Sequence, residues 1–153
     1  MICAGGGGIP VVRGKDGKME GVEAVIDKDH TSALLARALD ADVLLMLTDV
    51  EAVFRDCGGP DQSAITCITP DALDTMQFSK GSMGSKITAA SDFVPAGGKM
   101  AGIGCLQDAR AIVEERAGTR VRMEPNAVEA RLPGPKNAAQ TANHQPEAVQ
   151  GLA

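Results

Sequence analysis

Aromatic side chains are nearly absent from this chain of 153 residues, which has three Phe, no Trp and no Tyr. The hydrophobic fraction of 44% must therefore come mainly from aliphatic residues, as it often does in α/β proteins. Long apolar runs are missing too. None approaches the roughly 18 residues of a membrane-spanning helix, and no basic-then-apolar leader is present. We therefore expect a cytoplasmic protein with no membrane partner.

Metal ligands and clustered positive charge are also scarce. The four cysteines, at positions 3, 57, 67 and 105, form no C-x-x-C pair, and there are two histidines, so we expect no zinc site. The net charge is −5, and the 15 basic residues are scattered along the chain. A nucleic-acid-binding surface needs a clustered basic face, so we expect no nucleic-acid partner.

Glycine, by contrast, is abundant, with eighteen residues that cluster between apolar segments, as loops require. Apolar runs alternate with amphipathic segments over residues 1–123, which predicts an α/β fold with a mostly parallel sheet. We expect strands at 1–4, 22–26, 43–47, 99–105 and 119–123, helices ending near 39 and at 69–76, 86–94 and 107–115, and a turn at Asp16-Gly17. Beyond about residue 124, Pro, Asn, Gln and Ala dominate, and we expect no packed core.

The run from Val22 to Val50 is the most informative part of the chain. An apolar segment ends in Asp27-Lys28-Asp29, a helix capped by Asp29 or Thr31 follows, and a wholly apolar strand ends in Thr48-Asp49. We expect this strand to be buried on both faces, and the helix to bury Leu34, Leu35, Ala38 and Leu39. In open parallel sheets, ligands bind beyond the carboxyl ends of the strands. A lysine between two aspartates suits a polyphosphate there, and a solvated helix cap explains the same cluster about equally well.

Two glycine segments add to this pattern. Gly5, Gly6, Gly7 and Gly8 follow an apolar run and would let the backbone approach a ligand closely, a reading that we favour over a flexible turn. The segment Gly81-Ser82-Met83-Gly84-Ser85-Lys86 is similar to a phosphate-binding loop without matching the P-loop spacing. Lys86 starts a predicted helix and could reach a phosphoryl group. Taken by itself, this segment fits a surface lysine better.

Together these segments resemble the carboxy-terminal half of a carbamate kinase, in the amino acid kinase superfamily. The stretches that carry the resemblance are 2–11, 21–29, 47–50, 81–84 with Lys86, and 102–104 through 118–119. They follow one another in the family's order and at close to its spacing over about residues 1–122. The chain departs from the family at Asp40, where the family favours glycine, and at Ser85, where it has proline.

The resemblance implies a three-layer αβα sandwich, truncated at the N-terminus, and a homodimer when complete. Residues 1–122 would form the nucleotide-binding half. The composition of residues 123–153, which have no counterpart in the family, predicts a disordered tail. The implied activity is reversible phosphoryl transfer between ATP and carbamate with Mg²⁺. In arginine metabolism this reaction forms ATP from carbamoyl phosphate and ADP.

The resemblance also implies roles for individual residues. Lys28 and Lys86 would neutralise the transferring phosphoryl group, and Asp29 would orient both lysines. The nucleotide would contact Thr48, Asp49, Met83, Gly84 and Lys86, the substrate would contact Gly5 to Gly8, and no protein metal ligand is assigned. Two alternatives remain: a nucleotide-binding remnant without turnover, and an interaction domain on a Rossmann-like sheet.

Overall fold

The computed structural model describes residues 5–76, 78 and 81–124. The strand expected at residues 1–4 and the tail expected from residue 125 onward lie outside these residues. The described chain combines helices with a central sheet that includes parallel strand pairs, which confirms the α/β class. No helix in the described part is both long and apolar enough to span a bilayer.

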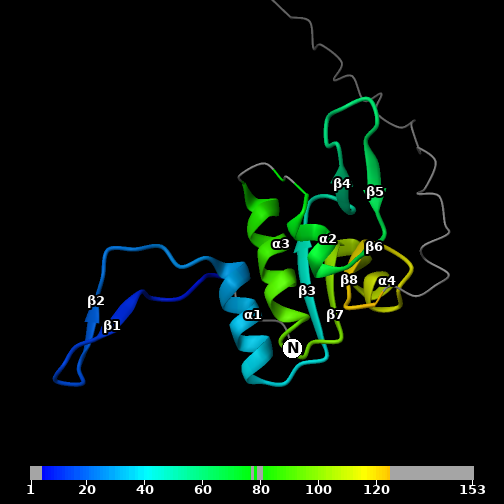
Figure 1. Ribbon diagram of the computed structural model, residues 1–153. Helices are drawn as coiled ribbons and strands as arrows, with labels where there is room; N and C mark the ends of the chain where they lie inside the picture. The colour runs from blue at the N-terminus through cyan, green and yellow to red at the C-terminus, as the bar shows by residue number, and fades with distance from the viewer. Residues whose placement is uncertain (1–4, 77, 79–80, 125–153) are drawn as a thin grey trace, which may run out of the picture.

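A four-stranded sheet in the order β3-β7-β8-β6 forms the centre of the fold (Figure 1). Strand β3 (Val43–Thr48) pairs in parallel with β7 (Met100–Cys105), and β6 (Cys67–Ile68) pairs in parallel with β8 (Thr119–Val121). Strands β7 and β8 are antiparallel, so the sheet is mixed.

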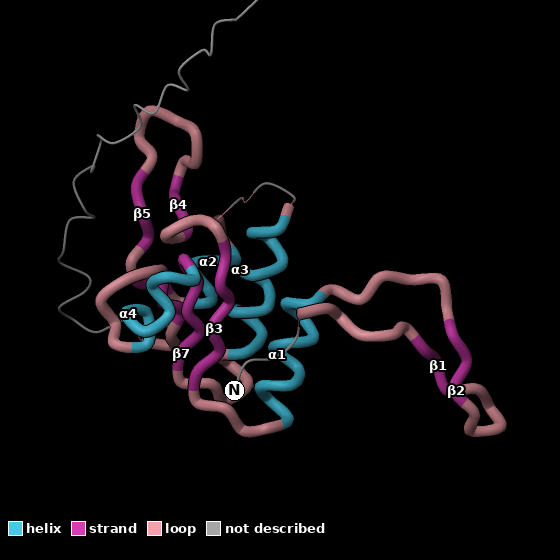
Figure 2. The backbone as a smooth tube through the Cα atoms, turned by 180° about the vertical axis from the view of Figure 1, so that it is seen from behind, coloured by secondary structure: helices cyan, strands magenta, loops and turns pink. Residues whose placement is uncertain are grey.

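Helices lie on both faces of this sheet (Figure 2). Helices α1 (Lys28–Ala38) and α3 (Ser82–Phe93) pack together on one face. On the other face, the short helix α4 (Ala109–Val113) follows the 3-10 turn η1 (Leu106–Asp108), where a longer helix at 107–115 was expected. The core is aliphatic apart from Phe93, as the composition predicts.

Both ends of α1 follow standard capping chemistry. The Asp27 carboxylate accepts hydrogen bonds from the backbone N–H groups of Asp29 (2.9 Å) and His30 (3.0 Å), so the expected cap at Asp29 or Thr31 is wrong. At the other end, Asp40 has a left-handed φ of 49°. Its N–H donates to the Arg37 carbonyl, and the N–H of Ala41 donates to the Ala36 carbonyl. This geometry normally selects glycine.

The buried face of α1 differs from the expected one. Small residues, Ala33 and Ala36, pack toward the core, while Leu34, Leu35 and Leu39 are exposed. Small residues allow α1 to approach α3 closely, which turns the larger leucines outward. Strand β3 likewise buries only alternate residues, Leu44 and Met46, so its expected burial on both faces is wrong. The other face of β3 is partly open, because a groove of about 380 Å³ lies between α1, β3 and α4. Strand β3 is also the outermost strand of the sheet, and no described strand pairs with its free edge.

The segment before α1 forms a hairpin that stands away from the sheet and helices (Figures 1 and 2). Strands β1 (Val11–Arg13) and β2 (Met19–Gly21) flank the expected Asp16-Gly17 turn, with Gly17 at a φ of 82°. The strand expected at 22–26 does not form, and Val25 is 96% exposed. A strand needs a ladder of backbone hydrogen bonds to a neighbour, and the described residues give this segment one, from the Val22 N–H to the Pro10 carbonyl.

Two short strands and helix α2 lie near the carboxyl end of β3 (Figure 1). Strands β4 (Val53–Arg55) and β5 (Ser63–Ile65) form a second hairpin, held to β8 through the Thr119 hydroxyl. Helix α2 (Pro70–Asp74) begins after the expected Thr69 cap. Helix α3 begins at Ser82, four residues before the expected start, and its helical residues end before Pro95 as expected.

Candidate functional site

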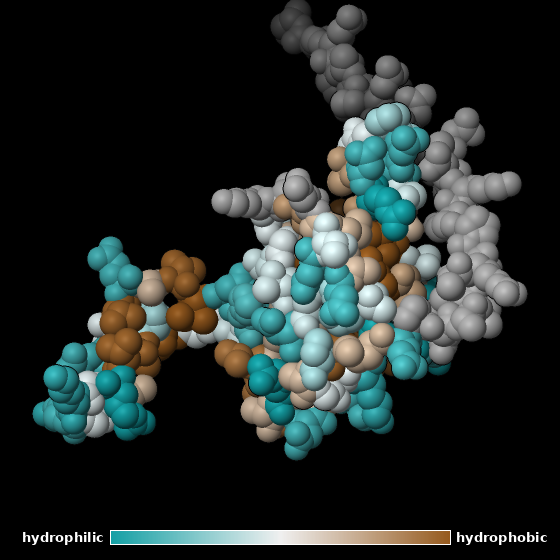
Figure 3. Space-filling view, viewed as in Figure 1, coloured by the Kyte–Doolittle hydropathy of each residue, from teal (hydrophilic) through white to brown (hydrophobic). Residues whose placement is uncertain are grey.

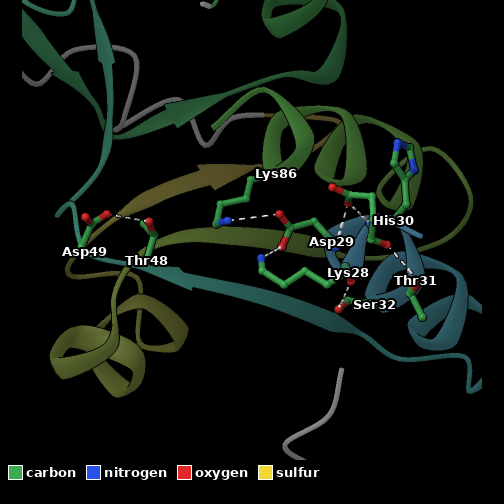
Figure 4. A network of polar contacts seen from close by, with 9 residues as sticks. Lys28, Asp29, His30, Thr31, Ser32, Thr48, Asp49 and Lys86 are labelled. Carbon is green, nitrogen blue, oxygen red and sulfur yellow. Dashed lines mark hydrogen bonds and ion pairs between the residues drawn. The ribbon is translucent and has the colours of Figure 1, made fainter. Parts of the chain in front are cut away.

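A buried carboxylate with a lysine on each side forms the centre of the candidate site (Figure 4). The Lys28 Nζ lies 2.8 Å from Asp29 Oδ1, and the Lys86 Nζ lies 3.1 Å from Asp29 Oδ2. Asp29 is 6% exposed and Lys86 is 4% exposed. The glycine segment taken alone favoured a surface position for Lys86, and this prediction is wrong. The structure does bring together Lys28, Asp29 and Lys86, the three residues for which the resemblance implies catalysis.

Local structure explains why these side chains meet. Asp27 caps α1, which puts Lys28 at the first helical position and Asp29 in the first turn. Lys86 comes from α3, which packs against α1 and carries the lysine on its buried side. Because Asp27 fixes the residue at which α1 begins, it also fixes the face of the helix on which Asp29 lies. That face is turned toward Lys86.

The electrostatics leave this site open to an anion. Asp29 shares one negative charge between two ammonium groups, because the Asp27 carboxylate is directed at backbone N–H groups instead. Hydrogen bonds from the backbone of His30 and from the Ser85 hydroxyl hold the pKa of Asp27 below its usual 3.8. The hydrogen bond to Asp29 raises the pKa of Lys28 above 10.5. The Lys28 side chain is 48% exposed, so a ligand can reach its ammonium group from solvent.

Thr48 and Asp49 lie at the same end of the sheet as this cluster. Helix α1 runs back along β3, so the beginning of the helix and the carboxyl end of the strand lie at one edge (Figures 1 and 4). The Thr48 hydroxyl donates to Asp49 Oδ1 at 3.0 Å, whereas Lys86 donates to Asp29. The expectation that the carboxyl end of a strand carries these polar side chains is confirmed for β3.

The glycine segment also reaches the start of α1. The Thr31 hydroxyl donates to the Gly7 carbonyl at 2.9 Å, a contact that sequence reasoning missed because nothing in the spacing of residues 7 and 31 reveals it. A Cβ atom on Gly7 would lie 1.8 Å from the Ile26 carbonyl oxygen, so only glycine fits there. Gly8 has a φ of 104°, which glycine adopts readily. Gly5 and Gly6 are exposed.

Met83 and Gly84 occupy the first turn of α3. The side chain of Met83 packs against the core, so this residue could offer a ligand mainly its backbone. Gly84 donates its N–H to the Gly81 carbonyl. Among the described residues, no three His, Cys, Asp or Glu side chains gather as a metal site would require. A metal ion with few protein carboxylates, as Mg²⁺ often is, takes its other ligands from phosphates and water.

Comparison with known proteins identifies the family. Residues 2–103 match the sequence model of the "Amino acid kinase family". Carbamate kinase from Haemophilus influenzae is 48% identical over 128 residues, which are 84% of this chain and 41% of that protein. Carbamate kinase from Rhizobium meliloti is 48% identical over 141 residues, or 88% of this chain and 44% of that protein.

Solved structures agree with the sequence relatives. Carbamate kinase from Giardia lamblia bound to AMP-PNP superposes with a TM-score of 0.73 and 37% identity, over 77% of this chain and 42% of that chain. A protein from Aeropyrum pernix superposes with a TM-score of 0.71 and 42% identity. The chain spans about two-fifths of the length of the curated relatives it matches. Over that span, this chain belongs to the amino acid kinase family.

Proposed function

We propose that the chain carries out carbamate kinase-like phosphoryl transfer between ATP and carbamate, and forms ATP from carbamoyl phosphate and ADP. The observation that carries this proposal is the buried Asp29 between Lys28 and Lys86, at the carboxyl end of β3. The relatives named carbamate kinases support the substrate, and the Giardia relative bound to AMP-PNP supports the nucleotide.

The proposed roles follow from the charge that moves in the reaction. The bond between phosphorus and the carbamate oxygen breaks, a β-phosphate oxygen of ADP takes the phosphoryl group, and carbamate leaves. Negative charge spreads over the phosphoryl oxygens as this happens, so fixed cations stabilise the transition state. Lys28 and Lys86 would supply those cations, and Asp29 would hold both in place without a covalent step.

The surrounding residues would bind the two substrates. Thr48, Asp49 and the first turn of α3 at Met83 and Gly84 would contact the nucleotide, and Gly5 to Gly8 would border carbamate. Mg²⁺ would arrive with the nucleotide phosphates, since the described residues form no metal site of their own.

A second candidate function is nucleotide binding without turnover. The observation that favours it is length, because the relatives carry more than half of their residues outside the matched region.

We further propose that residues 1–122 form the nucleotide-binding part of a three-layer αβα sandwich. A homodimer, a cytoplasmic location and a place in arginine metabolism belong to the same proposal.

Nucleotide binding and turnover together separate the two candidates. The purified 153-residue chain is heated with and without Mg-ADP, and ATP formation from carbamoyl phosphate is followed with luciferase. Stabilisation with turnover supports the kinase, and stabilisation without turnover supports the second candidate. A folded chain that neither binds Mg-ADP nor forms ATP contradicts both.

A further inference from the structure

We propose that the Thr31 hydroxyl is a positioning group that holds the glycine segment against the start of α1. It would set the distance between the Gly7 backbone and the cluster of Lys28, Asp29 and Lys86. This inference rests on the proposed function, in which Gly5 to Gly8 border carbamate. Thr31 would touch neither substrate and would act through Gly7.

The hydrogen bonds of Thr31 support this role. Its Oγ1 lies 2.9 Å from the Gly7 carbonyl oxygen and 2.9 Å from the Asp27 carbonyl oxygen. Threonine often bonds back to the carbonyl four residues earlier, so the Asp27 contact alone would be ordinary. The Asp27 carbonyl, however, already accepts the backbone N–H of Thr31 at 3.1 Å. Within the described part of the chain, the Thr31 hydroxyl is the one donor to the Gly7 carbonyl.

The two stems of the β1–β2 hairpin meet at this point. Gly7 on the incoming stem lies so close to Ile26 on the outgoing stem that no Cβ would fit between them. Farther out, the Val22 N–H donates to the Pro10 carbonyl at 3.1 Å. We call Gly7, Ile26 and Thr31 the hairpin clasp, because Thr31 ties the incoming stem to α1, which the outgoing stem joins directly.

Little else in the described part of the chain supports the hairpin. Every residue of β1 and β2 is exposed, and apolar side chains, including Ile9 and Val25, face solvent along the stems (Figure 3). An isolated two-stranded hairpin is marginally stable in water, so it does not fix its own orientation. The hairpin clasp therefore sets how the glycine segment meets the site. Its loss affects the carbamate side first, because the nucleotide side depends on β3 and α3.

The test compares Thr31→Val, which removes the hydroxyl and keeps the shape, with Thr31→Ser, which restores it. The matched control is Thr75→Val, because the Thr75 hydroxyl donates to the Ala72 carbonyl at 2.8 Å near the end of α2. We expect Thr31→Val to raise the KM for carbamoyl phosphate about fivefold, the factor for one net hydrogen bond. The KM for ADP should stay constant, and Thr31→Ser and Thr75→Val should behave like the unaltered chain.

Hydrogen exchange measures the hairpin clasp without turnover. We expect Thr31→Val to speed amide exchange about fivefold at Val22, whose N–H donates to the Pro10 carbonyl, and to leave residues 100–105 unchanged. Equal exchange in Thr31→Val and the unaltered chain would overturn the proposal. In an active chain, an unchanged KM for carbamoyl phosphate would overturn it too, as would equal increases in both KM values. An unaltered chain without turnover would contradict only the proposed function, and hydrogen exchange would still decide the hairpin clasp.

Discussion

Lys86→Met is the change that tests the buried ion pair most sharply. It removes a buried ammonium group and keeps the aliphatic stem that packs in the core. The Asp29 carboxylate then remains buried with Lys28 as its one lysine partner, and Lys28 is half exposed to water. Removal of one partner from a buried pair costs about 3–5 kcal/mol. Because Lys28 stays in place, we expect about 3 kcal/mol, the lower end of that range.

Asp29→Leu should be worse, since it leaves the buried Lys86 ammonium without its carboxylate. We expect about 3–5 kcal/mol, a large part of the 5–15 kcal/mol that typically stabilises a folded domain. The double variant Asp29→Leu/Lys86→Met removes both buried charges and replaces them with apolar side chains. Such replacements are often neutral or stabilising, so the double variant should unfold within about 1 kcal/mol of the unaltered chain. It should also lose phosphoryl transfer.

Urea unfolding at neutral pH measures all three variants. The matched control is Lys99→Met. Lys99 precedes β7, at the end of that strand away from the candidate site, and its Nζ lies 2.9 Å from Asp42 Oδ1 in an exposed ion pair. Loss of this pair should change the free energy of unfolding by about 0–1 kcal/mol. The reasoning is refuted if Lys86→Met and Asp29→Leu each cost less than about 1 kcal/mol and their effects add in the double variant. That outcome would mean that the two side chains do not share a buried contact in solution.

Two further predictions concern the ends of α1. Asp40→Gly should raise the free energy of unfolding by about 1 kcal/mol, because glycine adopts the left-handed φ of 49° without strain, whereas Asp40→Ala should give no such gain. An equal effect of both variants in urea unfolding would contradict this reading. Asp27→Ala should lower stability by about 1 kcal/mol at pH 7. Because the folded pKa of Asp27 lies below 3.8, its contribution is present above that pH and is lost as the pH falls through the folded pKa. The deficit of Asp27→Ala should therefore shrink in acid, and a deficit that stays constant down to the acid transition would exclude the charged cap.

Sequence periodicity predicted the elements whose signals are local. The apolar run at 43–47, the Thr69-Pro70 helix start and the Asp16-Gly17 turn all appear near their expected positions. Their patterns depend on residues within one turn or strand, so the chain itself carries the information. The same holds for Asp40, whose departure from the family's glycine falls on a left-handed residue.

Contacts between distant parts of the chain explain the features that the sequence did not predict. The leucines of α1 are exposed because Ala33 and Ala36 face the core, and a helical pattern alone does not reveal which neighbour a helix meets. The burial of Lys86 depends on Asp29, which lies 57 positions away in the sequence. A strand at 22–26 fails because a strand also requires a partner, which no local pattern supplies.

ATP formation from carbamoyl phosphate and ADP tests the central claim most directly, with the unaltered 153-residue chain measured beside Lys86→Met and Lys99→Met. The account predicts ATP formation by the unaltered chain and by Lys99→Met, and a fall of about a hundredfold or more in Lys86→Met, as for the loss of a group that stabilises the transition state. Equal rates in Lys86→Met and the unaltered chain would contradict the assignment of the buried lysine to phosphoryl transfer.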